Sequence, residues 1–246
     1  MKVLLTISAR EQGRDQVIQF GVPETQQEVQ HMHQLRYQVF VEKKRYISEA
    51  NGLEGSEMDQ FDHNDGCHYF IAQCDEHLVG SIRLIQQYPL PLQYHWRFEE
   101  PIDMKGLQHH QIVEVSRLVS HRPSAILIPP SLVPLGLIRC ATHFCLAHDI
   151  RAAYATMQMK LVRQMEQWGL PVQRMDAYEP INGESDDDPL KHYYNNPKYP
   201  VCPTYFRPQE VNHFYKDLLQ QALVFKQLTA EHYLYNPPVK ANAGAF

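Results

Sequence analysis

The stretch Ile112-Val-Glu-Val-Ser-Arg-Leu-Val119 is rich in β-branched and apolar residues but carries two charged residues. Such a run predicts a buried β-strand. Glu and Arg are seldom buried unless they are paired, because an isolated charge in an apolar environment is costly. We therefore expect Glu114 and Arg117 to meet charged partners from other parts of the chain.

Further ionic residues lie on the N-terminal side of this strand, in or beside apolar sequence. They are Arg36 with Phe40 four residues on, the acidic trio Glu57, Asp59 and Asp62, and Arg83 within Gly80-Ser-Ile-Arg-Leu84. If these groups converge from separate elements, they neutralise one another and line a charged pocket. Such a pocket indicates a functional site. The alternative is an ion-pair network with a structural role alone.

The elements around the strand alternate between the two regular periods. Strands are expected at residues 16–22, 68–74, 78–85, 112–119, 151–157 and 172–178, and helices at 24–44, 132–148, 159–168 and 208–228. Residues 47–66 and 189–203 are expected to be loops, 88–110 an excursion, 184–188 a solvated turn and the segment after 236 a disordered tail. This order predicts an α/β or α+β sandwich with a mixed sheet. We expect one domain over residues 1–182 and a C-terminal loop and helical extension over 183–246, packed on that domain.

Composition narrows the classes of protein. The 246 residues carry a net charge of -5, which argues against a nucleic-acid binder. Five cysteines form no disulfide framework, no apolar run reaches membrane-spanning length, and the N-terminal apolar run is too short for a signal peptide. We expect a cytoplasmic protein with reduced thiols that is not an integral membrane protein.

One short series of potential metal ligands occurs inside a predicted helix, at Cys140, His143, Cys145 and His148. At 100° per residue these side chains point to different sides of the helix instead of converging. We therefore predict no metal site.

The predicted order is compatible with an acetyltransferase-like fold, but one usual feature is missing. Most such proteins hold the pyrophosphate of coenzyme A with a glycine-rich turn at a helix N-terminus. The corresponding segment, residues 121–136, contains one glycine and several prolines. An acyl donor would have to be held in another way.

The ordered set of motif residues resembles that of the acyl-homoserine-lactone (autoinducer) synthases, the long-chain N-acyl amino acid synthases and the acyltransferases found beside exosortase systems. The residues that carry the resemblance are Arg36, Phe40, Tyr46, Glu57, Asp59, Asp62, Arg83, Glu114, Ser116 and Arg117. They span roughly residues 35–175. Autoinducer synthases carry Trp at the position of Tyr46, and the stretch from there to Glu57 is longer here, which favours the broader N-acyltransferase branch.

The resemblance implies a GNAT-type three-layer α-β-α sandwich and an acyltransferase. The implied reaction moves a fatty acyl group from an acyl carrier protein thioester to the amine of an amino acid or amino-acid derivative. No separate cofactor is expected, because phosphopantetheine arrives with the carrier protein. The alternatives are an acyl-homoserine-lactone synthase that uses S-adenosylmethionine and makes a quorum-sensing signal, or an inactive ligand- or carrier-binding module on this fold.

The resemblance also implies roles for residues. Glu114 would be the catalytic base and Arg117 its partner at the working end. The acceptor would meet Arg36, Phe40, Tyr46, Asp59, Asp62, Arg83 and Ser116, and the acyl chain Thr156 and Met157. The acidic carrier protein would dock on Lys160 and Arg163, which share one helix face, or on the basic run at residues 43–45.

Overall fold

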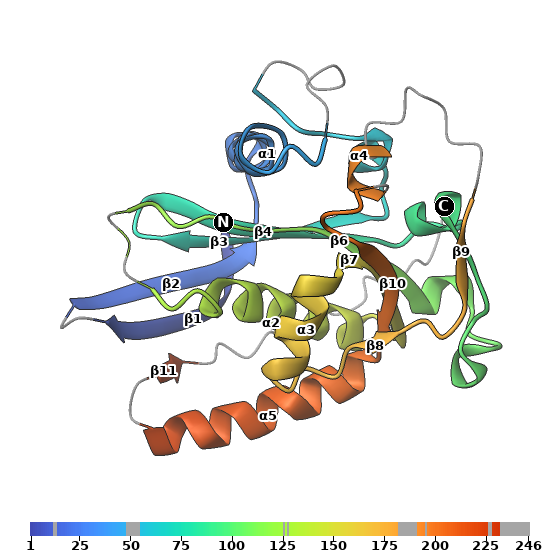
Figure 1. Cartoon of the computed structure of the whole chain (residues 1–246). Coiled ribbons are helices and arrows are strands. Elements are labelled where there is room, and N and C mark those ends of the chain that lie inside the picture. The colour runs from blue at the N-terminus through green and yellow to red at the C-terminus, as the bar shows by residue number, and fades with distance from the viewer. Residues whose placement is uncertain are drawn as a thin grey trace, which may run out of the picture.

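The computed structural model describes residues 1–11, 14–47, 55–124, 126, 128–181, 191–194, 196–225 and 228–231. In this part of the chain, one large sheet has the strand order β11-β1-β2-β3-β4-β6-β7-β10-β8 (Figure 1). Its strands are β1 (Lys2–Glu11), β2 (Arg14–Val22), β3 (Cys67–Cys74), β4 (His77–Ile85), β6 (Ile112–Ser120), β7 (Ala152–Gln158), β8 (Gln173–Arg174), β10 (Val201–Phe206) and β11 (Leu228–Glu231). β6 and β7 run parallel, and the other neighbouring strands pair antiparallel. The sheet is therefore mixed.

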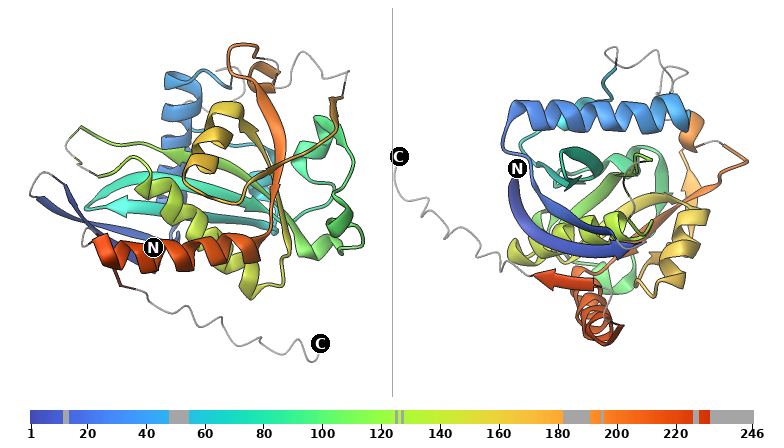
Figure 2. Two further views of the ribbon diagram at one scale, coloured as in Figure 1. Left: turned by 60° about the horizontal axis from the view of Figure 1, so that its bottom comes forward. Right: turned by 90° about the vertical axis from the view of Figure 1, so that its left-hand side faces the viewer.

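Helices cover both faces of this sheet. α1 (Gln26–Tyr37) and its π-helical continuation η1 (Gln38–Lys43) lie on one face, and α2 (Leu132–Ala147), α3 (Met159–Gln167) and α5 (Pro208–Phe225) lie on the other (Figures 1 and 2). The three-layer α-β-α sandwich predicted from the sequence is confirmed.

Short elements complete the description. The 3-10 turns are η3 (Gln60–His63), η4 (Pro91–Tyr94), η5 (Ile102–Met104) and η6 (His109–Gln111), and α4 (Lys191–Tyr194) is a single helical turn. β5 (Trp96–Phe98) and β9 (Tyr178–Pro180) form a separate two-stranded ribbon. The excursion at residues 88–110 and the segment after α3 thus pair with each other at the edge of the molecule.

Local sequence explains why the two helical layers pack where they do. Thr25 and Glu28 form a capping box that starts α1. On α2, a Cβ added at Gly136 would lie 2.2 Å from the ring of Phe20, so glycine lets this helix approach β2 closely. The main hydrophobic core lies between the sheet and α2, and Val211 and Tyr215 of α5 belong to it.

Most predicted elements are present with shifted ends, two predictions were wrong, and the structure has strands that were not predicted. Residues 172–178 do not form one strand, because β8 joins the large sheet while β9 pairs with β5. The predicted loop at 189–203 runs into β10, a fully buried strand that contains Pro203, and β1 was not predicted at all. The expected turn at 184–188 and the tail after 236 lie outside the described residues.

Two irregularities of the sheet position the site. The parallel pairing of β6 with β7 runs from Ile112↔Ala152 to Glu114↔Tyr154 and continues no further in the described ladder. On the other side of β6, Ser81 and Arg83 of β4 pair with Val119 and Ser116, so two residues of β6 face the single Ile82. β6 therefore diverges from one neighbour and bulges against the other within a few residues.

No helix in the part of the chain that the structure describes is long and apolar enough to cross a membrane.

Candidate active site

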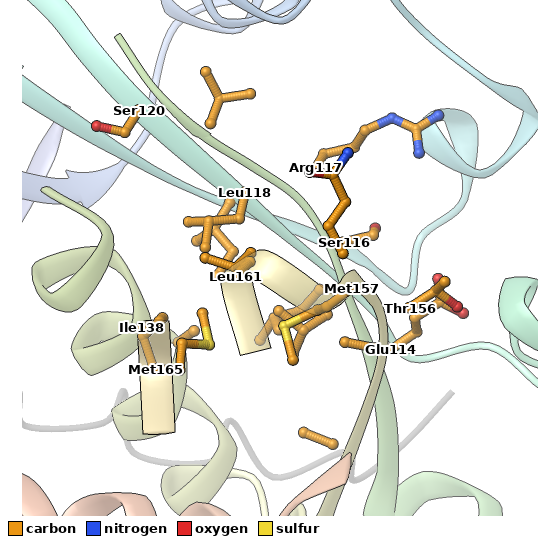
Figure 3. Close-up of a pocket in the computed structure, with 18 of the residues that line it drawn as sticks. Glu114, Ser116, Arg117, Leu118, Ser120, Ile138, Thr156, Met157, Leu161 and Met165 are labelled. Atoms are coloured by element: carbon orange, nitrogen blue, oxygen red, sulfur yellow. The ribbon is translucent and has the colours of Figure 1, made fainter. Parts of the chain in front are cut away.

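A cavity of about 430 Å³ lies where β6 and β7 separate. Strand residues 114–120 and 155–158 line it, as do side chains from both helical layers. In Figure 3, Glu114, Ser116 and Thr156 lie on one side of the view, and Ile138 and Met165 lie on the opposite side. The cavity therefore has a polar end and an apolar end.

The apolar end is built by the helices on the α2 face and by the last residue of β10. Its lining is Ile138, Ala141, Thr142, Cys145, Leu161, Met165, Phe206, Pro208 and Val211. The hydroxyl of Thr142 donates a 2.7 Å hydrogen bond to the carbonyl of Ile138, so this side chain adds little polarity to the cavity. A space of this kind suits a flexible apolar chain.

Glu114 is the ionisable group at the polar end. It is only 4% exposed, and its Oε2 accepts a 2.6 Å hydrogen bond from the backbone N–H of Leu92 in η4. Burial raises the pKa of Glu114 to about 7, although the Leu92 N–H and the arginines Arg83 and Arg117 favour its ionised form. A carboxylate that titrates near neutrality can accept and release a proton at working pH.

Arg117 occupies the bulge of β6 and has a φ of 53°. In a regular strand, side chains three residues apart, such as those of Glu114 and Arg117, would point to opposite faces of the sheet. Val113, Val115 and Leu118 pack into the core on the α2 side, whereas Val119 packs with Leu35 and Val39 on the α1 side. The alternation therefore changes parity at the bulge.

This change of parity directs Arg117 to the α1 face. Its Nε and Nη2 bind Glu57 Oε1 and Asp59 Oδ2 at 3.0 and 2.9 Å. Arg83 binds Asp59 through two hydrogen bonds of 2.7 and 2.8 Å and donates from Nε to the hydroxyl of Ser116 at 3.0 Å. Asp59 thus joins two arginines from neighbouring strands.

Arg36 extends the ionic network into α1. Its Nε binds Glu57 at 2.5 Å, and its two Nη atoms bind Asp62 at 2.8 and 3.0 Å. Arg83 also pairs with Asp62 at 2.8 Å, and the Tyr69 hydroxyl donates to the same carboxylate at 2.9 Å. Three arginines and three acids therefore balance in charge.

The arginines lower the pKa values of two of these acids, Glu57 and Asp62. Although burial opposes it, Arg117 and Arg36 lower the pKa of Glu57 to about 2, and Arg36 and Arg83 hold the pKa of Asp62 below its usual range. Both carboxylates stay ionised at neutral pH, and neither is suited to accept a proton. Glu114 lies beside this balanced network, and its raised pKa lets it gain or lose a proton near neutral pH.

The residues predicted to bind the acceptor divide into two groups. Phe40, Tyr46 and Ser116 line the cavity, together with the catalytic candidates Glu114 and Arg117. Arg36, Asp59, Asp62 and Arg83 lie behind that lining, where they pair with one another. Direct contact of these four with an acceptor stays a prediction.

The predicted acyl and docking residues also have definite positions. Thr156 and Met157 line the cavity, and so does Lys160, whereas Arg163 lies on the exposed part of α3. Lys44, from the second basic run, lines the same cavity. One residue of each candidate docking patch therefore lies at the cavity.

Three contributors to the site were missed in the sequence. Leu92 supplies its backbone N–H to Glu114, and Tyr193 and Tyr194 line the cavity from α4. The paired tyrosines were a visible signal within a segment interpreted only as a Pro/Tyr-rich loop. A backbone donor leaves no such signal.

Among the described side chains, no group of three or more His, Cys, Asp or Glu residues is placed to hold a metal ion.

A family model described as N-acyl amino acid synthase FeeM matches residues 31–176, more than half of the chain. A search of curated proteins gives no significant match.

Solved structures share the fold at low sequence identity. The acyl-homoserine-lactone synthase LasI is 19% identical with a TM-score of 0.53, and the match covers 78% of this chain and 90% of LasI. BjaI, described as a coenzyme A-dependent acyl-homoserine-lactone synthase with MTA, is 17% identical with a TM-score of 0.53, and the match covers 78% of this chain and 82% of BjaI. TofI, in a ternary complex with an inhibitor and MTA, is 15% identical with a TM-score of 0.51, over 78% of this chain and 91% of TofI. With the match to more than half of the sequence and a cavity that presents Glu114, the chain belongs to the N-acyl amino acid synthase FeeM family and is an N-acyltransferase.

Proposed function

We propose that this N-acyltransferase moves a fatty acyl group from the thioester of acyl carrier protein to the amine of an amino acid or amino-acid derivative. The observation that carries the proposal is the position of Glu114. Its carboxylate is buried at the polar end of a cavity whose other end is apolar, and its pKa is raised to about 7. The site thus offers a proton acceptor beside room for an acyl chain.

The chemistry needs a neutral amine and a polarised thioester carbonyl. Glu114 takes a proton from the acceptor amine, directly or through one water, and the amine nitrogen attacks the carbonyl carbon. The tetrahedral intermediate then collapses, the carbon–sulfur bond breaks, and the thiolate leaves with the phosphopantetheine arm. The proton held by Glu114 returns to solvent or to that sulfur, so the products are an amide and a thiol.

The negative oxygen of the intermediate requires hydrogen-bond donors in fixed positions. A β-bulge inserts one extra residue into a strand and leaves it outside the regular ladder of hydrogen bonds. Arg117 and Leu118 both lie opposite Ile82 of β4 in the ladder, and both line the cavity. The backbone N–H groups at this bulge are our candidates for that role.

The donor end of the proposal rests on charge. Lys44 and Lys160 line the same cavity, and an acidic carrier protein is attracted to such groups. The segment between β6 and α2 has no glycine, so it lacks the usual pyrophosphate-binding turn of a coenzyme A site. We accordingly propose that the pantetheine arm arrives on the carrier and that the enzyme needs no cofactor of its own.

The test is product analysis with purified components. The enzyme is incubated with acyl carrier protein loaded with a fatty acyl group, a mixture of amino acids and S-adenosylmethionine, and the products are identified by mass spectrometry. An N-acyl amino acid supports the proposal, whereas an acyl lactone identifies S-adenosylmethionine as the acceptor and refutes the amino-acid assignment. If acyl-coenzyme A serves and the acyl carrier protein does not, the donor assignment is wrong.

A matched pair of variants assigns the base. Glu114→Gln keeps the shape of the side chain but cannot accept the proton, and we expect it to lose the amide product. Glu179→Gln, on the exposed strand β9, should keep wild-type turnover. Wild-type turnover by a folded Glu114→Gln protein would exclude Glu114 as the base.

A further inference from the structure

Two tyrosines from the C-terminal part of the chain close the polar end of the cavity. Tyr193 and Tyr194 belong to α4, beyond residues 31–176 that match the family model. Both line the cavity, as Glu114 and Arg117 do. This part of the site is thus built by a segment that the family match does not cover.

Both rings are held from several sides. Tyr194 stacks on His95, with ring centroids 4.0 Å apart and an interplanar angle of 23°, and meets Trp96 edge-on at 6.0 Å. Tyr193 meets Tyr194 edge-on at 5.4 Å, and its hydroxyl donates to the backbone carbonyl of Thr156 at 3.3 Å. The pair therefore bridges the excursion before β5 and the end of β7.

The same rings continue to the opposite edge of the polar end. Tyr193 contacts Tyr46 with a centroid separation of 5.4 Å, and Tyr46 contacts Phe40 at 6.2 Å. All of these rings line the cavity. Four aromatic side chains thus form one wall of the polar end, which also contains Glu114 and Arg117.

The two hydroxyl groups remain uncharged at working pH. Burial raises the pKa of Tyr194 well above its usual range, and the neighbouring Glu114 carboxylate raises it further. Burial likewise raises the pKa of Tyr193. The wall therefore presents apolar ring surface and neutral hydroxyl groups to whatever approaches Glu114.

We propose that Tyr193 and Tyr194 select the acceptor by limiting the size of the side chain that a primary amine can bring beside Glu114. The inference rests on the proposed function and assigns specificity to residues outside the family match. Rigid aromatic rings define a fixed boundary, because they have few rotatable bonds and are anchored here by other rings. Shortening either one opens space on the acceptor side.

The experiment compares amines of graded size. The ratio of kcat/KM for tryptophan to that for glycine is measured with saturating acyl donor for the wild type, Tyr193→Ala, Tyr194→Ala and the milder Tyr194→Leu. We expect the ratio to rise by about tenfold in the truncated variants, as for a change in the size of an apolar pocket. Tyr194→Phe keeps the ring and should keep the wild-type ratio.

Tyr94→Ala is the matched control, because Tyr94 is 50% exposed and its ring contacts Phe61 at 6.3 Å. A ratio that stays at the wild-type value, or falls, in folded truncated variants overturns the proposal. So does an equal change in Tyr94→Ala.

A second readout separates this inference from the reaction itself. Calorimetry measures binding of the same amines to the enzyme without donor, for the wild type and for Tyr194→Ala. If the wild type forms no amide with any amine, the proposed function fails, but a shift in binding preference toward tryptophan still supports the size limit. Unchanged binding preference overturns it.

Discussion

The backbone N–H of Leu92 donates a 2.6 Å hydrogen bond to Oε2 of Glu114, and this bond joins the excursion before β5 to the centre of the sheet. The bond favours the ionised carboxylate, while burial opposes ionisation more strongly. The balance places the pKa of Glu114 at about 7.

The activity should depend on the ionisation of Glu114. Because a base must be unprotonated, we expect kcat/KM to fall about tenfold per pH unit below the apparent pKa of Glu114 and to level off above it. Acceptors whose amines have different pKa values separate the contributions, since the limb caused by Glu114 stays near pH 7 for all of them. A limb that moves with the pKa of the acceptor would assign it to the amine instead.

The stability should carry the opposite signature. The pKa of Glu114 is higher in the folded protein, about 7, than its ordinary value of 4.5, so the fold favours the protonated form. This advantage is complete below pH 4.5 and is lost as pH rises toward 7. At pH 8 we expect Glu114→Gln to raise the free energy of unfolding by about 3 kcal/mol. Urea titrations at pH 4.5 and pH 8 check this, and a difference that is the same at both pH values would contradict it.

The ionic network should matter for stability whether or not it touches an acceptor. Arg36 is 1% exposed, and Arg36→Met would leave Glu57 and Asp62 short of a buried partner. We expect the free energy of unfolding to fall by about 3–5 kcal/mol. Arg174→Met is the control, because its pair with Glu166 is 44% and 39% exposed and should contribute about 1 kcal/mol or less. Equal losses in the two variants would remove the distinction between buried and exposed pairs.

Docking of the carrier protein should depend on Lys44 and Lys160. We expect Lys44→Glu and Lys160→Glu to raise the KM for acylated carrier protein, and the wild-type KM to rise with salt, because the attraction is electrostatic. Transfer from a free acyl-pantetheine, which has no carrier, should change little. The exposed Lys105 provides the control substitution, Lys105→Glu. A KM for the carrier that neither variant alters would move the docking surface elsewhere.

The apolar end should set the length of the acyl chain. Val211 of α5 is 2% exposed and lines this end, so Val211→Phe should exclude the longest chains and Val211→Ala should admit longer ones. Each buried methylene contributes about 0.8 kcal/mol, so loss of room for two should lower the preference for the longest chain about tenfold. Mass spectrometry of products from a mixture of chain lengths measures this. Leu146→Phe, on the exposed side of α2, should leave the distribution unchanged.

Sequence reasoning worked best where a residue has few physical options. Glu114 and Arg83 lie within β-branched strands, so burial with a charged environment was the expected result, and both are at most 4% exposed. The layers of the sandwich also followed from periodicity. Pairing between distant segments was harder to predict. β5 and β9 pair although they lie far apart in the sequence, and no local pattern indicates that they meet.

The site itself could be predicted only in part. The sequence indicates which charges converge, but not that Arg36 and Asp62 satisfy each other behind the cavity wall. It also hides the contribution of Leu92, because a backbone N–H has the same chemistry in every residue except proline. Tyr193 and Tyr194 were visible as residues, but their place opposite Tyr46 depends on the path of the whole chain.

The bulge at Arg117 changes which residues of β6 face each helical layer. Up to Ser116, even-numbered residues face α1, and from Arg117 onward odd-numbered residues do. If the same sequence continued past Ser116 in regular alternation, without the bulge, all the residues that follow in β6 would exchange faces. Leu118 would then turn toward α1 and Val119 toward α2, and each side chain would leave the core in which it packs. The packing of the Leu118 and Val119 side chains in these two cores therefore maintains the bulge that directs Arg117 toward α1.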